Sequence, residues 1–177
     1  MIADIDSFLR YFDAVQRRTL RDIAALPDAA ERWAPPSGEG EGAWSIAEIV
    51  RHIAGTRLYF ARAYRGEGWL FSDPMRAVNC QADWVPCLEE AAVEFRRRLE
   101  GTPDDWLTRG VPMIDSDGAL SGWRILIMCL EHEVHHRSQI DTYAGLQGWP
   151  VPHIYGRSAE SIGLQGARQR RLHEADR

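Results

Sequence analysis

The sequence predicts an all-α fold, a four-helix bundle with a minor irregular or hairpin segment before the last bundle helix. Apolar residues recur every three or four positions over several long stretches, helix start and stop signals border these stretches, and strand patterns are scarce. The chain has 177 residues, of which 45% are hydrophobic and 27% charged. This length and composition are typical of a folded domain with a sizeable core.

Three helices are expected in the first hundred residues. A proline follows the first, Ser45 and Glu48 form a capping-box pattern at the start of the second, and a proline stands in the first turn of the third. Glycines follow the second helix. The expected ranges are residues 5–25, 46–65 and 83–99.

The fourth and longest helix is expected over residues 123–145, with glycine at its end. Before it, residues 111–119 contain the turn signal Asp115-Ser116-Asp117-Gly118 and predict a small hairpin. After it, residues 158–174 predict a weaker terminal helix. We therefore expect the bundle in residues 1–150 and a loop with a short helical tail in residues 151–177.

Half of the six histidines fall within residues 131–139 of the long helix. His132 and His136 are one turn apart and share a face, whereas His135 points elsewhere and is interpreted as a supporting or exposed residue. Two imidazoles within an apolar wall are costly unless something binds them. That face also contains Ile125, Cys129, Ile140 and Tyr143.

A third histidine, His52, borders the apolar stripe of the second helix. A single histidine more often has only hydrogen-bond partners, but bundle metal sites are built from facing helices. His52, His132 and His136 therefore predict a three-nitrogen metal site with open positions, and neutral imidazole suits Zn, Ni, Cu and Fe. Glu48 and Gln139 are candidates to bind the second ring nitrogens.

A competing interpretation uses the neighbouring glutamate. His132-Glu133-Val134-His135-His136 fits the H-E-x-x-H pattern of metallopeptidases, in which Glu133 would activate a metal-bound water. A third ligand would then be sought downstream, among His153, Glu160 and His173. No edge strand that could align a peptide is expected.

Charge and composition indicate which classes of binding partner and which compartment to expect. The net charge is −5, and no basic block is interleaved with aromatic residues, so nucleic acid is not an expected partner. No apolar run is long enough to span a bilayer, and the acidic start does not resemble a signal peptide. The three cysteines, Cys80, Cys87 and Cys129, lack metal-site spacing and predict reduced thiols in a cytoplasmic protein.

Two motifs give the chain a family resemblance. Trp44-Ser45-x-x-Glu48-x-x-x-His52-Ile53 and His132-x-x-x-His136-Arg137-x-Gln139 are similar to motifs of the DinB/YfiT-like family of helical metalloproteins. The resemblance covers about residues 5–148. Ser138 stands where the family commonly has glycine, and we expect this small residue to change little.

The resemblance implies a divalent metal such as Zn, Ni, Fe or Mn on His52, His132 and His136, and a homodimer. It also implies a small-molecule substrate and transfer of a low-molecular-weight thiol, such as bacillithiol or mycothiol, to an electrophile. Tyr59 is a candidate to orient the substrate, and a cationic rim for the thiol is sought among the arginines. The candidates for this rim are Arg51, Arg57, Arg62 and Arg137. A non-catalytic stress-response bundle is a further alternative.

Overall fold

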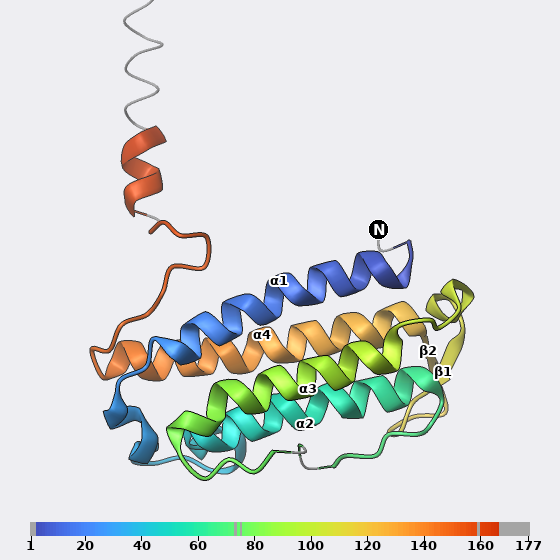
Figure 1. Cartoon of the computed structure of the whole chain (residues 1–177), viewed down its shortest axis with the longest axis horizontal. Helices are drawn as coiled ribbons and strands as arrows, with labels where there is room; N and C mark the ends of the chain where they lie inside the picture. The colour runs from blue at the N-terminus through green and yellow to red at the C-terminus, as the bar shows by residue number, and fades with distance from the viewer. Residues whose placement is uncertain (1–2, 73, 75, 159, 167–177) are drawn as a thin grey trace, which may run out of the picture.

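Four long helices run alongside one another in the computed structural model, which describes residues 3–72, 74, 76–158 and 160–166 (Figure 1). The helices are α1 (Ile5–Ala24), α2 (Ile46–Arg65), α3 (Trp84–Leu99) and α4 (Gly122–Leu146). Both α1 and α2 pack against α3 and α4. The predicted four-helix bundle is therefore confirmed.

Local signals in the sequence determine where the second helix begins and ends. The backbone N–H of Ser45 donates to Glu48 Oε2 at 2.7 Å, and the N–H of Glu48 donates to Ser45 Oγ at 3.3 Å. This is the predicted capping box, which satisfies two amides that the first turn leaves free. At the other end, Gly66 has a φ of +79°, a left-handed conformation that favours glycine.

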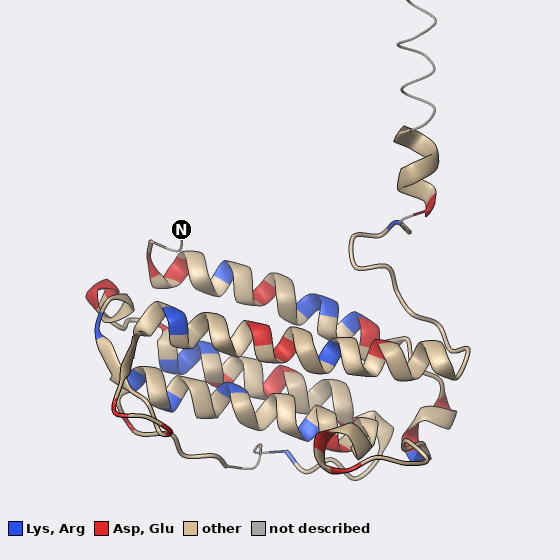
Figure 2. Ribbon diagram, turned by 180° about the vertical axis from the view of Figure 1, so that it is seen from behind, with Lys and Arg blue, Asp and Glu red and all other residues tan. Residues whose placement is uncertain are grey.

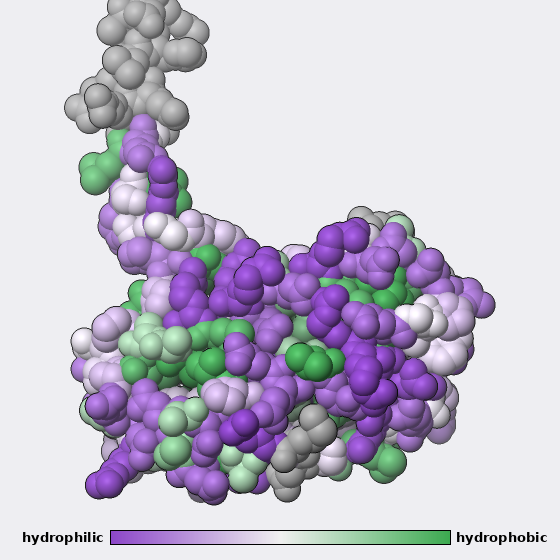
Figure 3. Space-filling view, viewed as in Figure 1, coloured by the Kyte–Doolittle hydropathy of each residue, from purple (hydrophilic) through white to green (hydrophobic). Residues whose placement is uncertain are grey.

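The core forms two connected regions along the bundle. One contains the aromatic residues Phe8, Phe12 and Phe95, and the other contains Ile49, Leu88 and their neighbours on α4. All five of these side chains are fully buried. On the outside, basic and acidic residues are interspersed along the helices (Figure 2), and the face seen in Figure 3 is mainly hydrophilic with smaller apolar patches.

The predicted hairpin precedes α4. β1 (Gly110–Pro112) pairs antiparallel with β2 (Ala119–Ser121), and Val111 lies opposite Leu120. Gly122 follows at once, where a Cβ atom would lie 2.1 Å from the carbonyl oxygen of Trp106. Only glycine fits this close approach, which positions the start of α4. Four short 3₁₀ helices complete the connections: η1 (Asp28–Arg32), η2 (Gly40–Ala43), η3 (Gln81–Asp83) and η4 (Asp104–Leu107).

The end of α4 differs from the prediction. The helix continues through Gly145 to Leu146, and the glycine with a left-handed conformation is Gly148, with a φ of +67°. The chain then leaves the bundle (Figure 1) and is helical again over residues 160–166. The predicted terminal helix extends to residue 174, so its second half lies outside the described residues. Among the described residues, no helix is long and apolar enough to cross a membrane.

Candidate metal centre

Three histidines from two facing helices meet between α2 and α4. His52 lies on α2, and His132 and His136 lie one turn apart on α4. The Nε2 atoms of His52 and His132 are 2.9 Å apart, and one ring nitrogen of each histidine lies within 4.8 Å of the others. Nitrogen ligands of a tetrahedral zinc ion lie about 3.3 Å apart. The three imidazoles are therefore close enough to hold one cation.

Hydrogen bonds on the far side of two rings direct their Nε2 lone pairs into this cluster. The Thr56 hydroxyl donates to the carbonyl oxygen of His52 at 2.8 Å, so its oxygen accepts from Nδ1 of His132 at 3.4 Å. Gln139 Oε1, which can only accept, lies 3.0 Å from Nδ1 of His136. In the tautomers that carry the proton on Nδ1, these contacts are satisfied and both Nε2 atoms can bind a metal.

The Nε2 atom of His136 tests whether these residues fit a metal. It is buried, and within the described part of the chain it has no hydrogen-bond partner. A buried ring nitrogen without a partner is costly. A cation bound by the three histidines would remove this cost, so the donor set fits a divalent metal.

The three rings are neutral at physiological pH. Burial, followed by the neighbouring His136, lowers the pKa of His52 to about 4. Burial and the other histidines lower the pKa of His132 to about 3. The pKa of His136 is also lowered, mainly by burial. Protons therefore compete little with a metal for these nitrogens at pH 7.

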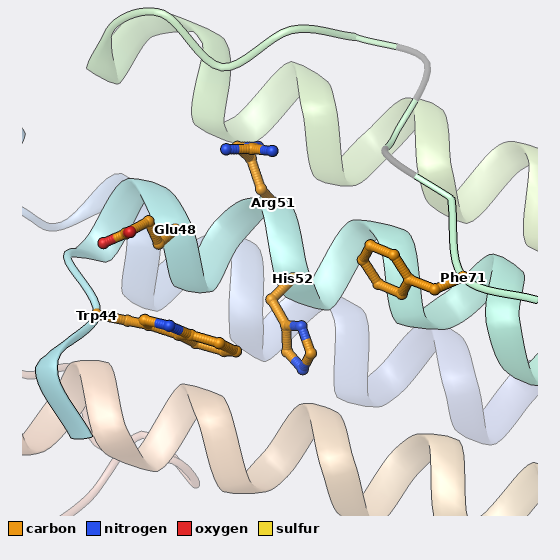
Figure 4. Close-up of a pocket in the computed structure, with 5 residues that line it drawn as sticks. All are labelled: Trp44, Glu48, Arg51, His52 and Phe71. Atoms are coloured by element: carbon orange, nitrogen blue, oxygen red, sulfur yellow. The ribbon is translucent and has the colours of Figure 1, made fainter. Parts of the chain in front are cut away.

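Aromatic side chains surround the imidazoles. Trp44 stacks on His136 with ring centroids 5.8 Å apart and contacts His52 at 4.7 Å. Phe71 stacks on His52 from the other side at 6.0 Å, and Figure 4 shows these two rings flanking His52. They line an open cavity of about 200 Å³ together with Glu48 and Arg51. His52 thus faces an open cavity between aromatic rings, whereas His136 is buried behind it.

Comparison with known proteins identifies the family. The model of the DinB superfamily matches residues 11–140, about three quarters of the chain. The chain belongs to the DinB superfamily. Among curated proteins, none matches it.

Solved structures of DinB-like proteins share the fold. YjoA from Bacillus subtilis has a TM-score of 0.63 at 17% identity, over 83% of this chain and 96% of its own. A DinB-like protein from Bacillus cereus has a TM-score of 0.61 at 19% identity, over 86% and 99%. YfiT from Bacillus subtilis, described as a probable metal-dependent hydrolase with an unusual four-helix bundle topology, has a TM-score of 0.63 at 14% identity, over 82% and 89%.

Glu133 of this DinB-superfamily protein lies outside the histidine cluster, contrary to the peptidase interpretation. Successive helix residues are about 100° apart, which turns Glu133 away from His132 and into the core. It is 1% exposed, and its carboxylate binds the buried guanidinium of Arg57. Two of the three downstream ligands considered, His153 and Glu160, are exposed beyond α4, and His173 lies outside the described residues.

Two arginines proposed for a cationic rim are also buried. Arg57 is 1% exposed and pairs with Glu133. Arg137 is 4% exposed, with Nε 3.5 Å from Asp22 Oδ2. The sequence pattern predicts the helix on which each arginine lies, α2 for Arg57 and α4 for Arg137, but not the face of the helix. An arginine paired with a buried carboxylate can lie inside a bundle.

The remaining predicted residues have mixed roles. Gln139 binds His136 as expected, whereas Glu48 accepts from the backbone and hydroxyl of Ser45 and completes the cap instead of binding His52. Tyr59 is half-buried against Trp69, with centroids 5.1 Å apart. The last two arginines lie farther out: Arg62 donates to the carbonyl oxygen of Leu70 at 3.0 Å, and Arg51 lies at the rim of the cavity.

Glu41 was missed by the sequence analysis. It belongs to η2, where its carboxylate and ring nitrogens of His135 and His136 lie within 4.8 Å of one another. Two bonds from α4 hold this loop: Gln139 Nε2 donates to the Glu41 carbonyl oxygen at 2.6 Å, and the Tyr143 hydroxyl donates to that of Gly42 at 3.3 Å. No pattern in the loop sequence identifies Glu41 as a candidate site residue. The one available signal is its position shortly before the cap of α2, the helix that carries His52.

Proposed function

We propose that this protein is a metal-dependent enzyme that transfers a low-molecular-weight thiol to an electrophilic substrate. The metal would be a divalent ion, such as Zn, Ni, Fe or Mn, held by His52, His132 and His136. The observation that carries this proposal is the convergence of the three histidines, with His52 lining an open cavity and the buried Nε2 atom of His136 without a hydrogen-bond partner among the described residues. Three protein nitrogens leave positions for an exogenous ligand, as in catalytic sites.

The thiol would come from a cosubstrate. A divalent metal held by these histidines would lower the pKa of a cosubstrate thiol; the thiol proton would pass to solvent, and the thiolate would be the nucleophile. Its sulfur forms a bond to the electrophilic carbon, and the leaving group departs with the electrons of the broken bond. The protein's own Cys87 and Cys129 are buried, and burial raises the pKa of Cys87 to about 11 and that of Cys129 further.

The chain's residues would supply binding and orientation. The rings of Trp44 and Phe71 would exclude water from the two sides of His52 that they cover. A thiolate bound there would be less hydrated and would therefore react faster. Arg51, at the rim, could contact an anionic thiol cosubstrate. The likeness to DinB-family proteins also supports a homodimer as the proposed assembly, which light scattering of the purified protein would test.

A second candidate is metal-dependent hydrolysis. The description of the structural relative YfiT as a probable metal-dependent hydrolase favours it. Because Glu133 is sequestered, Glu41 would be the carboxylate placed to accept a proton from an attacking water. Thiol-independent turnover that is lost in Glu41→Gln, with metal retained, would identify this reaction.

The decisive experiment begins with metal analysis of protein purified without a histidine tag, beside His52→Ala. We expect about one metal ion per wild-type chain and loss of it from the variant. The loaded protein is then incubated with thiols and electrophiles, and thioether products are identified by mass spectrometry. Metal that persists in His52→Ala would contradict the three-histidine site. A loaded protein that forms no thioether would contradict thiol transfer.

A further inference from the structure

Phe71 is half exposed but held in a defined place beside the candidate metal centre. Its side chain is 52% exposed, and its ring lies at 23° to the plane of His52. Gly55 on α2 allows this position: a Cβ atom there would lie 2.8 Å from Cζ of Phe71 and 3.0 Å from the carbonyl oxygen of Ser72. Glycine inside a helix is unfavourable. Here it permits the segment with Phe71 to lie against α2, one turn from His52.

Trp44 forms the opposite wall. It directly precedes Ser45, whose capping box fixes the start of α2. The indole contacts His52 and is nearly parallel to His136, at 24°. Figure 4 shows Trp44 and Phe71 on opposite sides of His52, while Arg51 extends from the other side of the helix and Glu48 extends toward the N-terminal end of α2. Two aromatic rings therefore flank His52, and Glu48 and Arg51 complete the lining of the cavity.

We propose that the substrate of this site carries a flat aromatic ring that binds in the cavity lined by Trp44, His52 and Phe71, against these aromatic side chains. The inference rests on the proposed thiol transfer and names its electrophile as an electron-poor aryl compound. The cavity of about 200 Å³ holds one ring or two fused rings and is smaller than a typical drug-sized site. An electron-poor ring stacks well on the electron-rich faces of indole and phenyl.

The aryl rings that a thiolate attacks most readily have the flat shape that suits a cavity flanked by aromatic side chains. Electron-withdrawing groups that make an aryl ring susceptible to a thiolate also leave it planar and neutral. Such a ring loses little by leaving water and needs no charged partner. Glu48, the acidic residue lining this cavity, is engaged by Ser45, so the aromatic rings provide the surface for a neutral planar group, with Arg51 at the rim.

Binding of nitrobenzene to the metal-loaded protein tests the proposal without turnover, because nitrobenzene has the ring but no leaving group. Its dissociation constant is measured by ligand-observed NMR. A stacked aromatic pair is worth about 3- to 10-fold in affinity. We expect Phe71→Ala and Phe71→Leu to weaken binding by this factor, and Gly55→Ala to do the same by displacing the ring. Leu70→Ala is the matched control, because Leu70 is the adjacent residue and is 59% exposed.

Nitrocyclohexane, which has the same polar group on a puckered ring, serves as the second probe and should bind more weakly than nitrobenzene. Equal affinity of the two probes, or equal nitrobenzene affinity in Phe71→Ala and wild type, would overturn the ring site. Metal content and melting temperature of each variant show that it is folded and loaded. If nitrobenzene binds as expected but no thiol is transferred to aryl electrophiles, the ring site stands and the proposed reaction fails.

Discussion

Arg57 and Glu133 join α2 to α4 through two parallel hydrogen bonds inside the bundle. Arg57 Nε lies 3.0 Å from Glu133 Oε2, and Arg57 Nη2 lies 2.9 Å from Glu133 Oε1. Thr19 of α1 donates to Glu133 Oε1 at 2.8 Å, and Arg57 Nη1 donates to the Leu88 carbonyl oxygen of α3 at 2.6 Å. One buried network thus contacts all four helices, two of which carry the histidines.

Glu133→Gln is expected to destabilise the protein while leaving metal binding intact. The substitution leaves the guanidinium of Arg57 buried without its counter-charge, which costs about 3–5 kcal/mol in similar sites. Urea unfolding measures the loss. The double variant Arg57→Met/Glu133→Leu removes both charges and should unfold closer to wild type. If Glu133→Gln has the stability of the wild type but has lost activity, this result would support a catalytic role for Glu133.

His132→Ala and His136→Ala are each expected to lose the metal, whereas His135→Ala should keep it. The first two remove a ring nitrogen of the three-histidine cluster, and a ligand loss of this kind leaves two weakly held donors. His135 is exposed and its ring lies beside the cluster. Elemental analysis after dialysis provides the measurement. Loss of metal from His135→Ala as well would indicate that the trio of Glu41, His135 and His136 is the true site.

The EDTA-treated protein is expected to lose stability as the pH falls from about 6.5 toward 4. An unfolded histidine binds a proton near pH 6.5, but folding lowers the pKa of His52 to about 4 and that of His132 to about 3. The unfolded state therefore binds more protons in this window, and stability rises with pH. Urea unfolding at pH 7 and pH 5 should show a smaller difference for His132→Asn. Equal differences in both proteins would contradict a buried neutral His132.

Asp141→Asn is expected to raise the melting temperature at pH 8. Burial, and then the charge of Asp22, raise the pKa of Asp141 to about 6. The folded state therefore disfavours its charged form, and this cost is present above pH 6 and disappears as the pH falls below about 4. Scanning calorimetry at pH 8 and pH 4 should show the stabilisation only at the higher pH. An unchanged melting temperature at pH 8 would show that nearby arginines compensate the charge.

Cys87 and Cys129 are expected to resist thiol reagents in the native protein. Both are buried, and the raised pKa of Cys87, about 11, leaves little thiolate at pH 8. Labelling with a chromogenic disulfide should modify Cys80, which is partly exposed, before the others. Denatured protein, in which all three react, is the control. Rapid native labelling of Cys129 would contradict its place in the core.

The sequence predicts the helices well because their signals are local. The capping box at Ser45 and the glycine after α2 determine an end by contacts within a few residues. The pair His132 and His136 could likewise be recognised, because helical spacing alone places both on one face. His52 could be added because a bundle brings facing helices together, although a separation of 80 positions along the chain does not itself give the distance between His52 and His132.

Contacts between helices limited the rest of the prediction. Glu133 and Arg137 directly follow His132 and His136 of the candidate metal centre, and their motifs suggested roles in the site. Their actual partners, Arg57 and Asp22, lie on other helices, and no local pattern shows that two charges will meet in the core. Glu41 and Phe71 were missed for a similar reason, because loops carry no periodicity that indicates where they pack.

Gln139 connects the histidine cluster to the loop before α2. Its carbonyl group holds His136, and its amide group holds the backbone of Glu41. A cation that orders His136 also steadies this amide, and through it the loop. By thermodynamic reciprocity, a ligand that orders the loop must increase the binding free energy of the cation by the same amount. A ligand that orders this loop would thus raise the affinity of the histidine cluster for a cation, and the cation would raise the affinity for that ligand by the same factor.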